Sequence, residues 1–369
     1  MAIYIHELSN WPSFEWNQDI INPLLSKLQH QQGRLLGRME ALGFGLQAEA
    51  NLETLTLDVI KSSEIEGEVL DSQQVRSSIA RRLGMDIAGL VPADRNVEGV
   101  VEMMLNATQH YNEQLTKERL FAWQASLFPA GYSGMQKIAV GKWRDNSKND
   151  PMQVVSGPMG RETVHYEAPE ATLLEKEMLK FLDWVNEKNN RDTLLSAAIA
   201  HLWFVTIHPF DDGNGRIARA ITDMLLARSD ATAMRFYSMS GQIRKERKEY
   251  YIILEQTQKG SLDITIWIQW FLGCLERAFA EVSNTLALIL KKASFWERNS
   301  VHQFNQRQKL MMNMLLDGFV GKLNTSKWAK ITKCSNDTAL RDIQDLLTKN
   351  VLEKEEAGGR STSYKLVSP

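Results

Sequence analysis

The amino-acid sequence predicts a mainly α-helical protein that carries two short β-hairpins. Over most of the 369 residues, apolar side chains recur at three- and four-residue steps, which is the spacing of an amphipathic helix. Alternating β-like runs occur only within residues 141–168 and near the C-terminal end. Hydrophobic residues make up 43% of the chain, so there is enough apolar mass for a folded core, and the length suits roughly two or three domains.

Residues 1–90 are predicted to form a helical N-terminal domain. Leucines and a methionine recur at helical spacing over 24–42, and the two glycines that follow would end this helix. A second helix is expected over 48–65, and a connector that contains glycine and proline follows at 83–95. Residues 1–60 carry three basic and seven acidic side chains, so this end of the chain is acidic.

Residues 96–285 are predicted to form a second helical domain that one β-hairpin interrupts. The stretch 141–168 is rich in glycine, proline and polar residues, and it contains two short β-like runs around a Gly-Pro-Met-Gly turn. Residues 193–207 are densely apolar, which suits a central buried helix. After a polar stretch, another helix is expected over 214–228.

Residues 300–369 differ in character, because three short helices precede a terminal hairpin around Gly358-Gly359. This order is typical of a winged helix-turn-helix domain. Residues 301–369 carry eleven basic and seven acidic side chains, so the near-neutral total of 43 basic and 45 acidic residues conceals a basic tail. DNA binding therefore stays open, with four candidate phosphate contacts: Lys327, Lys330, Lys333 and Arg341.

Several classes of protein are not expected from this sequence. The two cysteines, Cys274 and Cys334, have no His or Cys partner at zinc-ligand spacing, so a structural zinc site is not predicted. The N-terminus lacks the basic start of a secretory signal, and no stretch is long and apolar enough to span a membrane. We therefore expect a cytoplasmic protein with buried, reduced thiols and no membrane partner.

The most informative stretch is 208–219, which reads His-Pro-Phe-Asp-Asp-Gly-Asn-Gly-Arg-Ile-Ala-Arg. An apolar helix ends at a histidine, a Gly-Asn-Gly turn follows, and a new helix begins. Glycines let backbone amides approach a ligand closely, and a helix N-terminus attracts anions. Arg216 and Arg219 are three residues apart and share one face of the new helix, where guanidinium groups fit phosphate oxygens.

Two further side chains complete a predicted site for phosphoryl or nucleotidyl transfer. Asp212 would lie beside the phosphates, where a carboxylate can hold a Mg²⁺ that bridges them. His208 is the side chain of this loop that suits proton transfer near neutral pH, and Phe210 is expected to anchor the loop in the core. His201, two helical turns before His208, is either a metal-ligand partner or a core histidine.

This stretch resembles the signature of the Fic family, His-x-Phe-x-Asp/Glu-Gly-Asn-Gly-Arg-x-x-Arg, at every specified position. The resemblance implies a helical Fic core and an enzyme that moves AMP from ATP onto a protein Ser, Thr or Tyr hydroxyl. His208 would then be the general base, and Asp212 would coordinate Mg²⁺. The resemblance also implies that the phosphates of ATP are bound by Gly213, Asn214, Gly215, Arg216 and, at the γ-phosphate, Arg219.

The β-hairpin at 141–168 resembles the flap on which target proteins dock in this family. Tyr250 corresponds to an aromatic position near the adenine of family members, and a core tyrosine is the alternative. A plain surface hairpin is likewise the alternative to the flap. If the resemblance holds, the flap lines the nucleotide phosphates or the modifiable side chain with Val155, Ser156, Gly157 and Pro158.

A second motif, Ser62-Ser63-Glu64-Ile65-Glu66-Gly67, fits the pattern Ser/Thr-x-x-x-Glu-Gly/Asn. Its place on a predicted helix at about 56–68 resembles the inhibitory helix of Fic proteins that carry their inhibitor on the N-terminal side. The resemblance implies that Glu66 pairs with Arg219 at the γ-phosphate position, which a carboxylate cannot share with a phosphate. An ordinary helix end, in which Ser62 and Gly67 have no inhibitory role, is the alternative.

The resemblance extends to nearly the whole chain. The first ~85 residues are similar to the helical domain of bacterial stand-alone Fic proteins, and the tail is similar to their C-terminal winged helix. ATP and Mg²⁺ would be the cofactors, the partner would be a protein with a modifiable hydroxyl, including this chain itself, and a homo-oligomer stays open. The alternatives to AMP transfer are AMP removal, another Fic-type phosphotransfer, or a DNA-binding regulator whose Fic core senses nucleotide.

Overall fold

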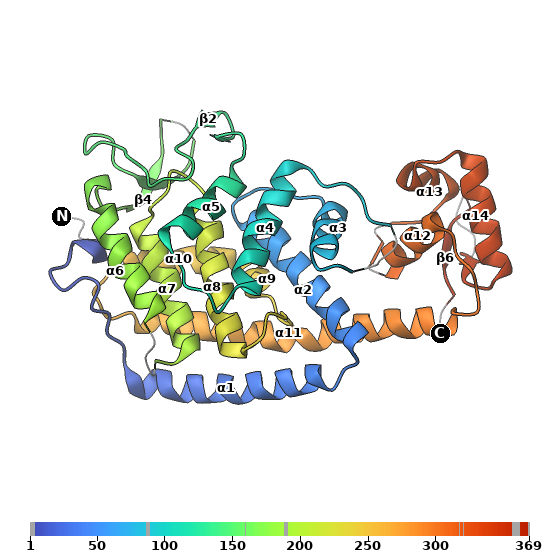
Figure 1. The fold of residues 1–369 in the computed structure, drawn as a ribbon, viewed down its shortest axis with the longest axis horizontal. Helices are drawn as coiled ribbons and strands as arrows, with labels where there is room; N and C mark the ends of the chain where they lie inside the picture. Colours follow the sequence, from blue (N-terminus) through green and yellow to red (C-terminus); the bar gives the residue numbers. More distant parts are fainter. Residues whose placement is uncertain are drawn as a thin grey trace. The chain divides into compact units, whose positions relative to one another are not determined.

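The structure, a computed structural model, describes residues 4–85, 89–158, 160–187, 191–316, 318–319, 321–355 and 362–367, apart from the side chains of 283–285 and 288. The described chain is mainly helical, as the sequence predicts, and its strands form two-stranded antiparallel sheets (Figure 1). It divides into two compact units. The larger contains residues 1–83 and 92–282, and the smaller contains 84–91 and 283–369.

The larger unit holds both the expected N-terminal helices and the expected catalytic helices. Its first elements are η1 (Ile5–Glu7), α1 (Gln18–Glu40), α2 (Phe44–Ile65), α3 (Ser72–Arg82), α4 (Arg95–Gln109), α5 (Lys117–Leu127), β1 (Tyr132–Ser133) and β2 (Gln136–Lys137). The next are β3 (Gln153–Ser156), β4 (Thr163–Glu167), η2 (Ala171–Leu173), α6 (Leu174–Asn186), α7 (Thr193–Ile207), α8 (Asn214–Asp230), α9 (Met239–Lys245), α10 (Arg247–Gln258) and α11 (Thr265–Arg298).

Helices α7 and α8 form the centre of this unit (Figure 1). Apart from Thr193 and Ser196, every residue of α7 is buried, because the segment is apolar on all faces and packs on every side. Helix α8 packs along α7, while α4 and α6 contact α8 and α7 respectively. The loop between α7 and α8 is therefore held at both ends by the core.

Helix α2 is unusual because several of its buried side chains are polar. It packs against α3, α8 and α9, and it buries Asn51, Asp58, Ser62 and Ser63. Polar groups inside a core are costly unless they are hydrogen-bonded. We therefore expect the buried polar side chains of this helix to have specific polar partners.

Strands β3 and β4 form the hairpin that the sequence predicts within 141–168. Their register runs from Gln153 opposite Glu167 to Ser156 opposite Thr163, with a shift between Val154 and Val155. The shift leaves His165 as the extra residue of a β-bulge, a feature that redirects a side chain. Met159, in the predicted turn, lies outside the described residues.

The smaller unit contains three helices after α11 and a hairpin, in the order expected of a winged helix-turn-helix. These are α12 (Gln306–Leu316), α13 (Thr325–Thr332), α14 (Asn336–Thr348), β5 (Leu352–Lys354) and β6 (Tyr364–Leu366). They enclose a core that includes the fully buried Met311, Trp328 and Ile343. The expected Gly358-Gly359 turn lies outside the described residues, and DNA binding through this unit stays a prediction.

The structure bears on two expectations, one about membrane-spanning helices and one about the two cysteines. No helix in the described ranges has both the length and the apolarity needed to cross a membrane. Cys274 is buried, as expected, whereas Cys334 is partly exposed, because it follows the end of α13 at the surface. Both are free thiols.

Candidate functional site

The loop 208–213 has an unusual backbone that specific contacts hold in place. Helix α7 ends at His208, whose φ of 51° lies in the left-handed region that non-glycine residues rarely adopt. Gly213 has a φ of 89° and starts α8, and a Cβ there would press on the Phe128 ring. The Asn214 side chain accepts a hydrogen bond from the Phe210 N–H (3.0 Å) and donates one to the Phe210 carbonyl (2.8 Å).

The imidazole of His208 is enclosed and neutral. Its Nδ1 lies 3.2 Å from the Val205 carbonyl, so Nδ1 is the donor and Nε2 keeps a free lone pair. Enclosure is the main cause that lowers the pKa of His208 to about 4, and the charge of Arg144 lowers it further, while the Val205 carbonyl, Glu66 and Asp212 act in the opposite direction. Such a histidine is ready to accept a proton at neutral pH.

His208 lines a cavity of ≈ 570 Å³ between the β3–β4 hairpin and α10. Of the residues predicted from the sequence, six line it: Glu66, Val155, Ser156, His208, Gly215 and Tyr250. The other predicted site residues, which include Asp212, Arg216 and Arg219, are not among the residues that line it. A ligand of nucleotide size would therefore touch the predicted base, the predicted inhibitory carboxylate and the hairpin together.

Arg219 and Glu66 form the ion pair that the inhibitory motif implies. Arg219 Nη2 lies 2.7 Å from Glu66 Oε1, and Arg219 also donates to Ser62 through Nε at 2.9 Å and to its carbonyl through Nη2 at 2.9 Å. A Cβ at Gly215 would overlap the Glu66 carboxylate, so only glycine allows that carboxylate to rest on the first turn of α8. Arg219 Nη1 is buried and has no hydrogen-bond partner among the described residues.

Gly67 explains how two carboxylates reach this site from one helix end. Its φ of 86° lets the chain reverse after α2, and the Glu68 N–H bonds back to the Ser63 carbonyl at 3.0 Å. Glu68 then lies 2.8 Å from Arg216 Nη1, and Arg216 Nε remains buried without a partner among the described residues. The sequence analysis missed Glu68, because the inhibitory motif ends before it.

Asp212 points to a neighbouring hydroxyl rather than to a cluster of ligands. Its carboxylate accepts a hydrogen bond from Ser133, and it is partly exposed. No group of three or more His, Cys, Asp or Glu side chains able to hold a metal occurs within the described ranges. The donor set of one carboxylate and one hydroxyl fits Mg²⁺ only if phosphate oxygens complete the shell, as Mg²⁺ sites commonly require.

Tyr250 and His201 form a buried pair behind the cavity. His201 Nε2 lies 3.0 Å from the Tyr250 hydroxyl, and His201 Nδ1 lies 2.9 Å from the Thr222 hydroxyl. Both ring nitrogens of His201 therefore have a partner, which favours the core histidine of the two alternatives, and burial lowers the pKa of His201 to about 3. Tyr250 is 2% exposed, whereas the neighbouring Tyr251 is 37% exposed and lines the same cavity.

The hairpin carries a chain of hydrogen bonds that the sequence analysis did not find. Ser156 Oγ lies 2.6 Å from His165 Nε2, and His165 Nδ1 lies 2.8 Å from Glu255 Oε2 on α10. The β-bulge turns His165 toward these partners. Gly157, with a φ of 106°, and Pro158 continue from β3 into the turn, and neither is among the residues that line the cavity.

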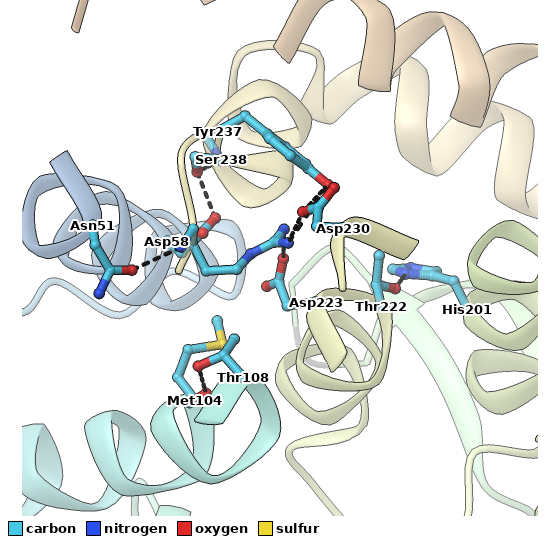
Figure 2. A network of polar contacts seen from close by, with 12 residues as sticks. Asn51, Asp58, Met104, Thr108, His201, Thr222, Asp223, Asp230, Tyr237 and Ser238 are labelled. Atoms are coloured by element: carbon cyan, nitrogen blue, oxygen red, sulfur yellow. Dashed lines mark hydrogen bonds and ion pairs between the residues drawn. The ribbon is translucent and has the colours of Figure 1, made fainter. Parts of the chain in front are cut away.

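A buried polar network holds α2 beside the site (Figure 2). The Ser238 hydroxyl donates to Asp58, and the Arg235 N–H donates to the Asn51 side chain at 2.7 Å. The Arg235 guanidinium binds Asp230 at 2.8 Å and Asp223 at 3.2 Å. Helix α2 is thus anchored through Asn51 and Asp58, and then through Ser62 and Glu66 to Arg219.

Comparisons with known families match two stretches of the chain. Residues 114–226 match the Fic/DOC family, and residues 4–85 match a domain of unknown function, DUF4172. A protein adenylyltransferase Fic of Nematostella vectensis is 37% identical over 108 residues, which is 28% of this chain and 23% of that protein. A protein adenylyltransferase fic-1 of Caenorhabditis elegans is 45% identical over 56 residues, 14% of this chain and 11% of that protein.

The matched part therefore spans about a quarter or less of the length of these curated relatives. Solved structures give longer matches at lower identity. A Fic family protein from Desulfovibrio desulfuricans G20 has a TM-score of 0.52 and 20% identity, over 94% of this chain and 97% of that one. A Fic domain containing signaling protein from Bacteroides thetaiotaomicron VPI-5482 has a TM-score of 0.52 and 20% identity, over 72% and 97%. These likenesses concern the fold.

Proposed function

This chain carries a Fic/DOC-family domain over residues 114–226, and on that premise we propose that it is a protein adenylyltransferase. It would transfer AMP from ATP to a hydroxyl of a protein, with Ser, Thr and Tyr as the acceptor class. The curated relatives named protein adenylyltransferase support the general reaction. The acceptor protein and the restraint by Glu66 are proposals for this chain.

One observation carries the proposal: two buried arginines of α8 present unpartnered N–H groups, and Glu66, the carboxylate that pairs with one of them, lines the same cavity as His208. Arg219 Nη1 and Arg216 Nε have no hydrogen-bond partner among the described residues, and both arginines lie in the first turns of α8. Unpaired buried donors are costly, so their presence favours a ligand that accepts hydrogen bonds. The N-terminus of α8 adds its own attraction for phosphate.

The proposed reaction uses each group for one task. The acceptor hydroxyl oxygen attacks the α-phosphorus of ATP, the bond to the β-phosphate oxygen breaks, and pyrophosphate leaves. His208 Nε2 takes the proton of the attacking hydroxyl. Arg216, Arg219 and the amides of the Gly-Asn-Gly turn bind the phosphates. Asp212 would hold Mg²⁺, which neutralises phosphate charge when bound.

Glu66 would restrain this reaction because its carboxylate rests where phosphate would bind. It pairs with Arg219 and touches the first turn of α8 at Gly215. Two like charges about 4 Å apart repel by about 4 kcal/mol at an effective dielectric constant of ~20. The γ-phosphate and the Glu66 carboxylate therefore compete for Arg219. ATP can bind productively only after the carboxylate moves away.

AMP removal is the second candidate, and the position of Glu66 favours it. The Glu66 carboxylate and His208 line the same cavity, so a water molecule held by Glu66 could attack an AMP-bearing protein there. The acid–base demands are similar in both directions. The two reactions are distinguished by whether AMP accumulates on, or disappears from, a protein.

The test compares four forms of the full chain with ATP and Mg²⁺: wild type, Glu66→Gly, His208→Ala and a matched control, Glu64→Gln. Glu64 lies on α2 and pairs with Lys61 and Arg244 instead of Arg219. We expect Glu66→Gly to add AMP to the chain at least about tenfold faster than wild type and Glu64→Gln, and His208→Ala to add none. Intact mass gives the readout.

Other outcomes are decisive as well. A phosphate-sized mass shift would favour a different phosphotransfer. Equal rates for Glu66→Gly and wild type would overturn the inhibitory role, and equal rates for His208→Ala and Glu66→Gly would overturn the role of the histidine. Loss of AMP from a previously modified chain in wild type but not in Glu66→Gly would favour the second candidate.

A further inference from the structure

Arg144 is a buried arginine whose partners lie on both sides of the candidate site. It lies in the connection between β2 and β3 and is 2% exposed. Its Nε donates to the His208 carbonyl at 2.8 Å, and its backbone N–H donates to the Pro209 carbonyl at 3.0 Å. One residue therefore binds both carbonyls at the point where α7 gives way to the loop.

The rest of the guanidinium holds the base of the β3–β4 hairpin. Nη2 donates to the Pro169 carbonyl at 2.5 Å, just after β4, and Nη1 donates to the Asn146 side chain at 2.6 Å. All of these acceptors are neutral oxygens. Burying a guanidinium against neutral oxygens is costly, and burial lowers the pKa of Arg144 to about 10, although the charge of Asp211 acts in the opposite direction. This cost indicates that the contacts serve a local geometry.

This local geometry is the left-handed backbone conformation of His208. A left-handed conformation costs a non-glycine residue free energy and persists only when its surroundings enforce it. Arg144 supplies that enforcement, because the carbonyls of His208 and the following residue both point to it. It also places a cation at the C-terminal end of α7, where the helix dipole favours positive charge.

We propose that Arg144 is a positioning residue for His208: its guanidinium holds the His208 backbone in the left-handed conformation that places the imidazole in the cavity. The inference rests on the proposed function, since it concerns the same histidine. Lysine cannot replace this residue, because only the planar guanidinium fork reaches the His208 carbonyl, the Pro169 carbonyl and the Asn146 side chain at once.

Arg144 has a second effect, because its positive charge disfavours protonation of the imidazole. Arg144, Glu66 and Asp212 are the charged groups with the largest effects on His208, and both carboxylates act against the arginine. Arg247, Lys248 and Glu255 line the same cavity. Removing the arginine should therefore raise the pKa of His208 from about 4 toward its ordinary value of 6.5. A change in the pKa of His208 therefore distinguishes an effect of Arg144 on His208 from a general contribution of Arg144 to folding.

The experiment uses Arg144→Met and Arg144→Lys in the full chain, in the Glu66→Gly background. The matched control is Arg119→Met, because Arg119 also binds main-chain carbonyls, at Asn106 and His110, but makes no described contact with the 208–213 loop. Two readouts are needed. One is the NMR titration of the His208 ring, assigned with His208→Ala, and the other is AMP transfer at saturating and limiting ATP.

We expect Arg144→Met to raise the titration midpoint of His208 and to lower kcat by about 100-fold, with KM for ATP changed less than about threefold. Arg144→Lys should keep the midpoint closer to wild type and still lower kcat, while Arg119→Met changes neither. An unchanged midpoint together with a kcat no lower than that of Arg119→Met would overturn the proposal. If no form transfers AMP, the proposed function fails, but the titration still decides the role of Arg144.

Discussion

Two buried arginines of the larger unit, Arg219 and Arg235, are paired in opposite ways. Arg219 is 1% exposed and Arg235 is 0% exposed, so burial does not distinguish them. Their partners do: the Glu66 side chain is 33% exposed, whereas those of Asp223 and Asp230 are 1% exposed each. The proposed exchange of a carboxylate for a ligand from the cavity is therefore open to the first pair and closed to the second.

The two clusters also differ in how many groups surround the charge. Arg235 has two carboxylates in contact, Asp58 nearby and the Tyr237 ring against its guanidinium at 4.6 Å (Figure 2). Arg219 has one carboxylate and one serine in contact. Each of the two guanidinium groups keeps one buried N–H without a partner among the described residues, Nη1 in Arg219 and Nε in Arg235. Two buried carboxylates around one guanidinium, a closed cluster, are typical of a structural lock, whereas a single, partly exposed carboxylate, an open cluster, is typical of a binding site.

Replacing each arginine by methionine tests this difference most directly, and the largest effect is expected at Arg235. We expect Arg235→Met to lower the free energy of unfolding by about 3–5 kcal/mol, because it leaves buried carboxyl groups without their cation. Chemical denaturation measures it. The control is Asp58→Asn, which leaves both ion pairs of Arg235 in place and should therefore cost less, about 1 kcal/mol. A cost for Arg235→Met no larger than for Asp58→Asn would contradict the lock.

We expect Arg219→Met to affect stability less than Arg235→Met does and to affect AMP transfer strongly. Its cost in stability should stay below about half that of Arg235→Met, because Glu66 can turn to water once its partner is gone. In the Glu66→Gly background, AMP transfer should fall by about 100-fold, since the γ-phosphate loses its guanidinium. Equal losses of stability at the two arginines, with transfer intact, would mean that Arg219 is structural.

Ser62 gives a graded test of the open cluster. Ser62→Ala removes one hydrogen bond that orients the Arg219 guanidinium toward Glu66. We expect self-modification about three- to tenfold faster than wild type, and slower than Glu66→Gly, because a charged hydrogen bond contributes about 1 kcal/mol or more. Ser63→Ala serves as the control, because its hydroxyl is buried without a partner among the described residues. If both serine variants behave alike, the Ser62 contact does not restrain the site.

The smallest effect is expected in the pH dependence of AMP transfer, because the buried groups of the two regions shift their pKa values in opposite directions. Burial raises the pKa of Asp58, Asp223 and Asp230 in the closed cluster, whereas enclosure lowers that of His208 at the site to about 4. His208 is therefore deprotonated well below neutrality. AMP transfer by Glu66→Gly should change by less than about a tenth between pH ~7 and pH ~5.5. A histidine with a pKa of 6.5 would lose most of its free base over that range, so a steep decline would contradict this assignment.

The sequence predicted the elements whose signal is local. Residues 193–207 match α7 because they are apolar on every face, and the 208–219 motif located the loop and the start of α8 because its residues are contiguous. The pairing of Glu66 with Arg219 was predicted only through a family resemblance, because 153 residues separate the two.

Three other sets of contacts could not be predicted from the sequence. Arg144 is a single arginine in a polar stretch, and the two partners that matter for the site lie 25 positions away at Pro169 and 64 positions away at His208. His165 is displayed by a β-bulge, which a strand pattern does not reveal. Arg235, Asp223 and Asp58 look like surface charges in the sequence, because only the packed helices bury them.

The anchoring of α2 has a mechanical consequence. Asn51, Asp58, Ser62 and Glu66 follow one another at steps of seven, four and four residues, so they lie along one side of the helix and its end. Removing one residue between Asp58 and Ser62 would turn everything after it by about 100°. Glu66 would then face away from Arg219 although every interacting side chain were still present. The number of residues between Asp58 and Glu66 thus determines whether the carboxylate meets Arg219 at all.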